Sequence, residues 1–308
     1  MSLKDTGEDV EVESKKVELN LPHVSIITPT YNKKEFFKLA IHNFMSFDYP
    51  RDKLEWIILD DGDESIKDIL PNDPRIKYYY YNKETKDQIY KSFIENYKKR
   101  KEEYNKLSKK DKKGHKYKLA TYHKKHFFGN RLPLGMKRNI CVQYAANDYI
   151  VHMDDDDFYP PKSIKMRITE LLNGTGAPLS EGTGAPLSEC VGCANIGCFH
   201  INKMISLVYT PKEEYSAAKK ISVATLAYTK SFWMQNKFDN QDIIGEGEHF
   251  LKKRKCKVIN WANVIVALFH PKNDQNIKIF ANLTEPNGWH YYPLKDELFT
   301  LITSLCEK

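Results

Sequence analysis

The sequence predicts an α/β fold: a Rossmann-like, mostly parallel central sheet, flanked by helices, in a single domain. Two observations predict it. Short β-branched or apolar segments alternate with segments whose apolar residues recur every three or four positions, as in strands joined by helices. Two of the predicted strands also run directly into acidic clusters, at residues 60–63 and 154–157. The domain is predicted over residues 23–308, after a charged, mobile arm over residues 1–22.

The first elements read as strand, helix and strand. Residues 23–30 form a β-branched run that ends in Pro and Asn, which is typical of a buried parallel strand leading into a loop. Residues 34–47 carry the apolar stripe of an amphipathic helix. Residues 54–59 form a second apolar strand, which stops at the first acidic cluster. This order is that of a βαβ unit.

The pattern then repeats along the chain. Residues 76–81 are a predicted third strand, 135–146 a helix, 149–153 a strand and 163–172 a helix. The strand at 149–153 runs into four consecutive aspartates. Further on, the predicted elements are strands over residues 205–209, 223–228 and 264–269 and a short helix over 248–253.

Two segments interrupt this pattern. Residues 83–128 are rich in Lys and Tyr but poor in aliphatic side chains, so we predict an insertion. Residues 173–189 are predicted to be a flexible loop, because the Gly/Pro/Ser-containing octapeptide GTGAPLSE occurs there twice in tandem.

Composition excludes several classes of protein. With 308 residues, 41% hydrophobic and only 14 Gly and 14 Pro, the chain is neither globally disordered nor fibrous. No apolar run reaches the roughly 18 to 20 residues of a membrane-spanning helix, and no secretory signal is recognised, so we expect a soluble, cytoplasmic protein. A net charge of +7 favours anionic partners.

The four aspartates at 154–157 predict a metal site. In an open α/β sheet, ligands bind beyond the carboxyl ends of the strands. Four adjacent carboxylates repel one another unless a cation neutralises them. Mg²⁺ or Mn²⁺ prefers such oxygen ligands together with substrate phosphates. The alternative is a solvated acidic turn that caps the helix starting near Ser163.

Four motifs in order carry a family resemblance. They are PTYN at residues 29–32, DDG at 60–62, GMKRN at 135–139 and NDYIVHMDDDD at 147–157. In order and spacing they resemble the motifs of family-two nucleotide-sugar glycosyltransferases, which have the GT-A fold. The match covers residues 23 to about 170, slightly under half of the chain.

The resemblance implies a nucleotide site and a metal site. Thr28, Pro29 and Tyr31 would line the base pocket, and Asp60 or Asp61 would meet the uracil or ribose. Arg138 would lie near the base and diphosphate. The structural alternatives are that Tyr31 caps a helix, Arg138 pairs with a surface acid and Asp60 orders a turn.

In the DxD motif, Asp154 would contact the ribose or the metal, with Asp155 beside it in the donor site. Asp156 would ligate the metal, and Asp157 is the candidate second ligand. His270 follows a predicted strand and is a candidate third ligand or diphosphate contact, although a lone His is more often structural.

Transfer to a hydroxyl also needs a base that takes its proton. In the resembling family this base lies late in the chain, in a Glu-Asp segment that opens a helix. Here Gly247 stands where Asp is expected if Glu246 aligns with Glu. Glu248 is therefore predicted as the base because it falls in the first helical turn, with Glu246 as the alternative and His249 as a weaker option. Either Glu could instead cap the helix.

These inferences predict a metal-dependent, inverting glycosyltransferase that moves a sugar from a UDP-sugar to a hydroxyl of a glycan, protein or lipid. One alternative is a basic protein that binds a membrane surface or, less favoured, nucleic acid through the lysines of residues 97–126. Another is a nucleotidyltransferase of similar fold. Cys190, Cys193, Cys198 and His200 have zinc-ligand types, but their spacing favours buried thiols.

Overall fold

A computed structural model describes residues 20–106, 131–173, 189–201, 205–242, 245–270, 289–291 and 296–306. Three predictions lie wholly or largely outside these residues: the N-terminal arm, the Lys-rich segment after residue 106 and the duplicated octapeptide.

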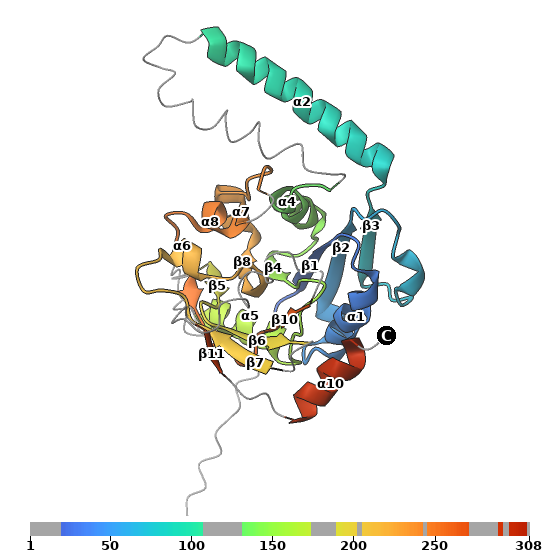
Figure 1. Ribbon diagram of the computed structural model, residues 1–308, viewed down its shortest axis with the longest axis vertical. Helices are drawn as coiled ribbons and strands as arrows, with labels where there is room; N and C mark the ends of the chain where they lie inside the picture. The colour runs from blue at the N-terminus through green and yellow to red at the C-terminus, as the bar shows by residue number, and fades with distance from the viewer. Residues whose placement is uncertain are drawn as a thin grey trace, which may run out of the picture.

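A seven-stranded sheet forms the centre of the molecule, with strand order β3-β2-β1-β4-β8-β5-β9 (Figure 1). The first four strands in this order are mutually parallel, whereas β8 runs antiparallel to both β4 and β5. The predicted mostly parallel α/β fold is therefore confirmed. The strands are β1 Val24–Thr30, β2 Leu54–Asp60, β3 Ile76–Tyr80, β4 Tyr149–His152, β5 Cys190–Gly192, β8 Ala227–Thr229 and β9 Lys257–Val258.

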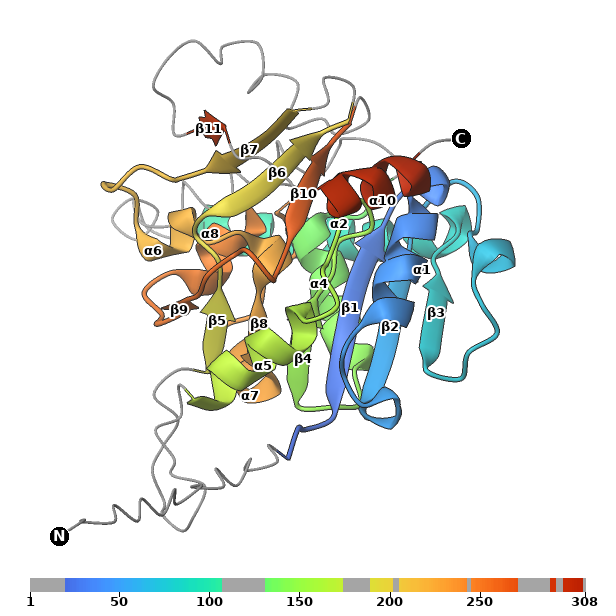
Figure 2. The same ribbon diagram turned by 90° about the horizontal axis from the view of Figure 1, so that it is seen from below.

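Helices cover both faces of this sheet because its strands are apolar on both sides. Along β1, Val24 and Ile26 belong to one buried cluster and Ile27 to another, as expected from the alternation of side chains in a strand. Helices α1 (Phe37–Ser46) and α5 (Ser163–Asn173) pack into the first cluster and lie in front of the sheet in Figure 2, whereas α4 (Leu134–Tyr144) packs into the second.

A second, four-stranded sheet was not predicted. Its order is β10-β6-β7-β11, and Figure 2 shows it at the end of the central sheet toward which β1 points. Its anchor is a bridge between Phe158, just after the acidic motif, and Val266, with N···O distances of 3.0 and 2.8 Å. The strands are β6 Ile196–His200, β7 Ile205–Tyr209, β10 Val266–Phe269 and β11 Trp289–Tyr291.

Some boundaries differ from the prediction for local reasons. The strand expected over 223–228 begins as a 3₁₀ turn, Val223–Thr225, so only β8 is extended. Helix α8 (Glu246–Leu251) starts earlier than expected, after Gly245 in the left-handed region at φ 73°. Elements not predicted include α7 (Lys230–Gln235), capped by the Thr229 hydroxyl, as well as α6 (Ala217–Lys220) and α10 (Asp296–Cys306).

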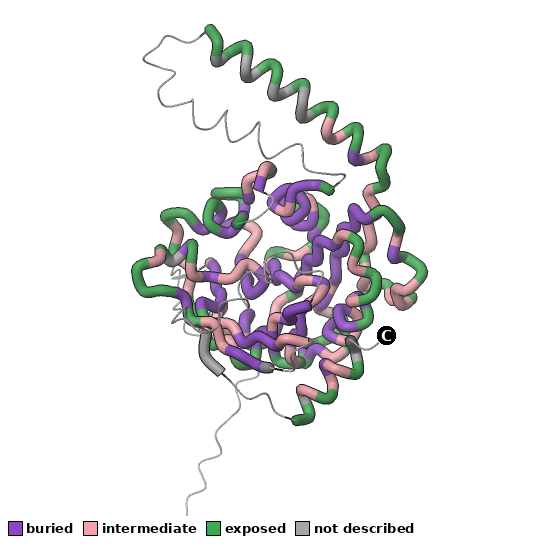
Figure 3. Tube along the Cα trace, in the orientation of Figure 1, coloured by how far each residue is buried: buried purple, intermediate pink, exposed green. Residues whose placement is uncertain are grey.

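The described part of the Lys-rich insertion is a helix, α2 (Lys83–Lys106), which projects from the body (Figure 1) and is exposed along most of its length (Figure 3). Its first turn is nevertheless attached to the core. Lys86 is buried, and its Nζ donates to the backbone carbonyl of Asp61 at 2.7 Å. Within the described residues, no helix is both long and apolar enough to cross a membrane.

Candidate active site

The carboxyl ends of β1, β2 and β4 meet at one edge of the central sheet. β1 lies between the other two, in parallel register that pairs Thr30 with Asp60 and Ile27 with His152. The chain order of the strands reverses between β1 and β4, which is the position where open α/β sheets bind ligands. The predicted site residues that follow these three strands therefore share one region.

Two of the predicted base-pocket residues have structural roles here. The Thr28 hydroxyl donates to the carbonyl of Met153 at 2.7 Å and accepts from Trp56 Nε1 at 2.8 Å, which ties β1 to both neighbouring strands. Asp60 is buried and orders the turn after β2, since its two oxygens accept from the Gly62 amide at 2.8 Å and the Tyr78 hydroxyl at 2.6 Å. Pro29 is also buried in β1.

Asp61 forms a buried ion pair with Lys137, in which Nζ lies 2.7 Å from Oδ1 and neither side chain is exposed. Burial lowers the pKa of Lys137, and the Asp61 carboxylate opposes that shift. Tyr31 lies above this pair as a partly exposed ring. Arg131 Cζ lies 5.1 Å from the ring centroid, and the ammonium groups of Lys86 and Lys137 lie 6.0 Å from it. Of these three cations, Lys86 and Lys137 are buried and bonded to Asp61, so Arg131 is the exposed one.

Arg138 links three elements of the site. Its Nε donates to Glu246 Oε1 at 3.0 Å, its Nη2 donates to Asp154 Oδ1 at 3.1 Å, and its Nη1 lies 3.1 Å from His152 Nδ1. Burial would lower the pKa of Arg138, but the Asp154 and Glu246 carboxylates raise it above its ordinary value. The guanidinium thus joins α4 to the end of β4 and to α8. The structural alternative, in which Arg138 only pairs with a surface acid, does not describe this buried network.

Asp156 and His270 lie together although 114 residues separate them in the sequence. Asp156 Oδ2 lies 3.0 Å from His270 Nε2 and 2.9 Å from Lys33 Nζ. Burial would raise the pKa of Asp156, but the hydrogen bond with His270 and the Lys33 charge outweigh it, so the pKa lies below its ordinary value. The structure therefore brings together two of the three predicted metal ligands.

The third predicted ligand, Asp157, has a different partner in the structure. Its Oδ1 accepts from the amide of Leu268 at 2.9 Å and so holds β10 against the acidic motif. Burial and the charges of Asp156 and Asp154 raise its pKa well above the ordinary value. Asp155 is also buried, and burial together with the Asp156 charge raises its pKa to about 7.

The two candidate bases lie on different faces of α8. Residues two apart in a helix point about 200° apart. Glu246 is buried against Arg138, whereas Glu248 is exposed. Glu248 was favoured only because it falls in the first turn of the helix. In the structure it is Glu246 that pairs with Arg138, which also pairs with Asp154. A Cβ at Gly247 would lie 2.3 Å from Val223 Cγ2, so this position has no room for the expected Asp.

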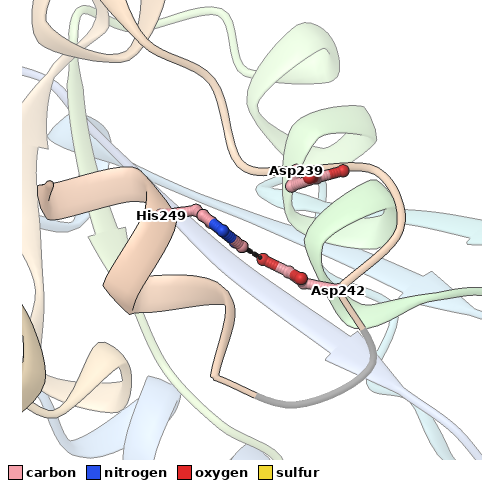
Figure 4. A group of neighbouring side chains, drawn as sticks. All are labelled: Asp239, Asp242 and His249. Carbon is pink, nitrogen blue, oxygen red and sulfur yellow. Dashed lines mark hydrogen bonds and ion pairs between the residues drawn. The ribbon is translucent and has the colours of Figure 1, made fainter. Parts of the chain in front are cut away.

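A cluster that the sequence analysis missed lies beside α8: Asp239, Asp242 and His249 (Figure 4). His249 Nδ1 lies 2.6 Å from Asp242 Oδ2, and the Asp242 carbonyl accepts from the amide of Gly135 at 3.0 Å. The cluster connects α8 to the start of α4. A Cβ at Gly135 would lie 2.1 Å from the Asp239 carbonyl oxygen, which explains the glycine.

In the described residues, the side chains at the end of β4 form no group of three possible metal ligands within 4.8 Å of one another, so an ion there would need further donors from a substrate diphosphate or from water. A carboxylate and an imidazole already lie within 3.0 Å of each other, and Asp154, two residues earlier, keeps 28% of its side chain exposed. Oxygen and imidazole donors of this kind suit Mn²⁺. His270 Nδ1 is buried without a hydrogen-bond partner, and the ring packs on Phe36 with centroids 4.0 Å apart, which fixes its orientation.

The predicted buried thiols are confirmed. Cys190, Cys193 and Cys198 are buried and form no disulfide, and Cys190 Sγ lies 2.9 Å from Cys256 Sγ. In the described part of the chain, no group of three metal-ligating side chains includes a cysteine.

Comparisons with known proteins find similarity to solved structures alone: no protein-family model and no curated protein matches the chain. A mannosyltransferase, PcManGT from Pyrobaculum calidifontis in complex with GDP-Man and Mn²⁺, is 15% identical with a TM-score of 0.49, over 83% of this chain and 59% of that one. TarS 1-349 from S. aureus in complex with UDP-GlcNAc is 13% identical with a TM-score of 0.48, over 92% and 65%. The chain thus spans less than two thirds of the length of either protein.

Proposed function

We propose that this chain is a glycosyltransferase that moves a hexose from a UDP-sugar to an acceptor hydroxyl with the help of Mn²⁺ or Mg²⁺. One observation carries the proposal. At the carboxyl end of β4, the Asp156–His270 pair comes two residues after Asp154, which the buried Arg138 guanidinium joins to Glu246. Side chains of metal-ligand type and a carboxylate on α8 are therefore linked to the point of the sheet where ligands bind.

The nucleotide would bind between the ends of β1 and β2. Its base would lie against the exposed part of Tyr31, and Arg131, which the sequence analysis did not single out, would attract the phosphates. Both Asp61 oxygens already accept hydrogen bonds from the chain, from the Leu132 amide and from Lys137 Nζ. Asp61 would therefore not contact the nucleotide itself but would hold Lys137 in place.

Asp156 and His270 would hold the divalent ion, with Asp154 able to add a third donor. A bound ion of this kind neutralises the charge that develops on the leaving diphosphate. Asp157 would leave only its Oδ2 for the ion while its Oδ1 accepts from the Leu268 amide.

The transfer step would be a single displacement. The acceptor oxygen attacks the anomeric carbon, the bond from that carbon to the diphosphate oxygen breaks, and UDP leaves with the electron pair. The acceptor proton passes to a carboxylate, for which we propose Glu246. Attack from the face opposite UDP inverts the anomeric configuration.

Ligand-induced stabilisation tests the proposal. UDP with Mn²⁺ at about 100 times its dissociation constant should add about 2.7 kcal/mol to the free energy of unfolding and raise the melting temperature by several degrees. UDP with EDTA should give a much smaller shift. No shift with UDP and Mn²⁺, together with salt-sensitive binding of RNA or of anionic vesicles, would contradict the proposal and favour a basic binding protein.

Glu246→Gln should reduce sugar transfer by about 10²-fold or more, the scale of a missing general base, while UDP and Mn²⁺ still bind. The amide keeps a hydrogen-bond acceptor for Arg138, so the fold should survive, which urea unfolding checks. Glu248→Gln is the matched control on the exposed face of the same helix, and it should retain transfer to within about twofold. If Glu248→Gln loses transfer and Glu246→Gln does not, the assignment of the base is wrong.

A further inference from the structure

Lys33 places an ammonium group directly on the Asp156–His270 pair. Its Nζ lies 2.9 Å from Asp156 Oδ2 and 3.4 Å from His270 Nε2. The side chains of Lys33 and Asp156 keep 16% and 15% of their surface exposed, so the ion pair is mostly buried but solvent still reaches it. The residue follows the PTYN motif, and Asn32 adopts a left-handed conformation at φ 51°, which turns the chain between β1 and α1.

The contact matters because it uses the same carboxylate as the proposed ion. A divalent ion binds a carboxylate oxygen at about 2.0 to 2.2 Å. With Lys33 Nζ 2.9 Å from Asp156 Oδ2, an ion on that oxygen would lie within about 5 Å of the ammonium. Like charges at that separation repel strongly in a partly buried site. The ion and the ammonium therefore cannot share Asp156 without a large cost.

The surroundings favour movement of Lys33 over movement of the other two side chains. His270 is buried and packs on Phe36, and Asp156 is on the short connection between β4 and the Phe158–Val266 bridge. Lys33, by contrast, has a flexible four-carbon side chain that can carry its charge several ångströms away.

We propose that Lys33 is a resident counter-cation that occupies Asp156 in the metal-free protein and is exchanged for the divalent ion when the donor site is loaded. This inference rests on the proposed function and deepens it. Lys33 keeps the acidic motif neutralised and folded before the ion arrives, at the cost of a lower affinity for the ion. Lys33 is thus a positioning residue, since it acts through Asp156.

Manganese affinity in the absence of nucleotide tests the exchange, measured by the EPR signal of free Mn²⁺ during titration. Lys33→Met removes the charge and keeps the length of the chain, so it should tighten Mn²⁺ binding about tenfold. Lys33→Arg keeps a cation and should bind Mn²⁺ like the natural sequence. Lys34→Met is the matched control, because Lys34 pairs instead with the exposed Asp68 at 2.7 Å, and it should change nothing.

Adding Asp156→Asn to Lys33→Met should abolish the gain, because the contested carboxylate is gone. Equal or weaker Mn²⁺ binding by a folded Lys33→Met protein would overturn the inference. The inference would also be overturned if the protein bound UDP without metal and bound no Mn²⁺ at all, because Lys33 would then replace the ion permanently. If UDP with Mn²⁺ binds neither the natural sequence nor Lys33→Met, the proposed function itself fails. If UDP still binds but Lys33→Met leaves the Mn²⁺ affinity unchanged, only the exchange at Lys33 fails.

Discussion

Asp156→Asn is expected to remove the manganese-dependent part of UDP binding, with the affinity in the presence of Mn²⁺ falling by at least about 100-fold. The amide has nearly the shape of the carboxylate but no charge, so it holds a divalent ion beside His270 far more weakly and does not offset the Lys33 ammonium. Calorimetric titration of UDP, with and without Mn²⁺, measures the effect directly.

The control for this variant is Asp68→Asn, which removes an exposed carboxylate paired with Lys34. It should leave UDP binding unchanged, because exposed ion pairs contribute little. Far-UV circular dichroism checks that Asp156→Asn is folded. A folded Asp156→Asn protein that retains manganese-dependent UDP binding would show that the ion is held elsewhere.

Arg138→Met is expected to destabilise the protein by about 3 to 5 kcal/mol, the cost of breaking a buried ionic network by removing one partner. The substitution leaves the Glu246 carboxylate buried without its cation, and Asp154 loses the same partner. Arg138→Lys should recover only part of the loss, because one ammonium cannot reproduce the fork that reaches Glu246, Asp154 and His152. Urea denaturation measures both.

Two comparisons make this prediction specific. Lys165→Met removes an exposed pair with Asp48 and should cost no more than about 1 kcal/mol. Adding Glu246→Gln to Arg138→Met should restore part of the lost stability, because the stranded buried charge is neutralised. Equal stabilities for the Arg138→Met and Lys165→Met proteins would show that the network around Arg138 is not structural.

The parallel part of the fold was predictable from local patterns. The runs that form β1, β2 and β4 are mostly apolar or β-branched, β3 is rich in Tyr, and α1 shows a clear apolar stripe. The small second sheet was not predictable in this way. β6 pairs with β10, whose residues lie about 70 positions later, and no local pattern encodes that pairing. The strands β5 and β9 have only three and two residues, too few to show a period.

For the candidate site, the sequence could indicate residue types but not their partners. The aspartates after β4 were identified, yet their separate roles depend on long-range contacts: Asp157 accepts from Leu268, and Asp156 pairs with Lys33. Glu246 and Glu248 could not be distinguished without the arginine that α4 brings to one face of α8. Lys33 carried only a weak signal, its position directly after the PTYN motif.

We expect the carboxylates at the end of β4 to hold a divalent ion that neutralises the diphosphate. Diffraction from crystals grown with Mn²⁺ and UDP, recorded at the manganese absorption edge, tests it most directly. The expected result is an anomalous peak bonded to Asp156 and to the diphosphate, with the Lys33 ammonium moved off the carboxylate. UDP bound with no anomalous peak there, and Lys33 still on Asp156, would contradict the claim.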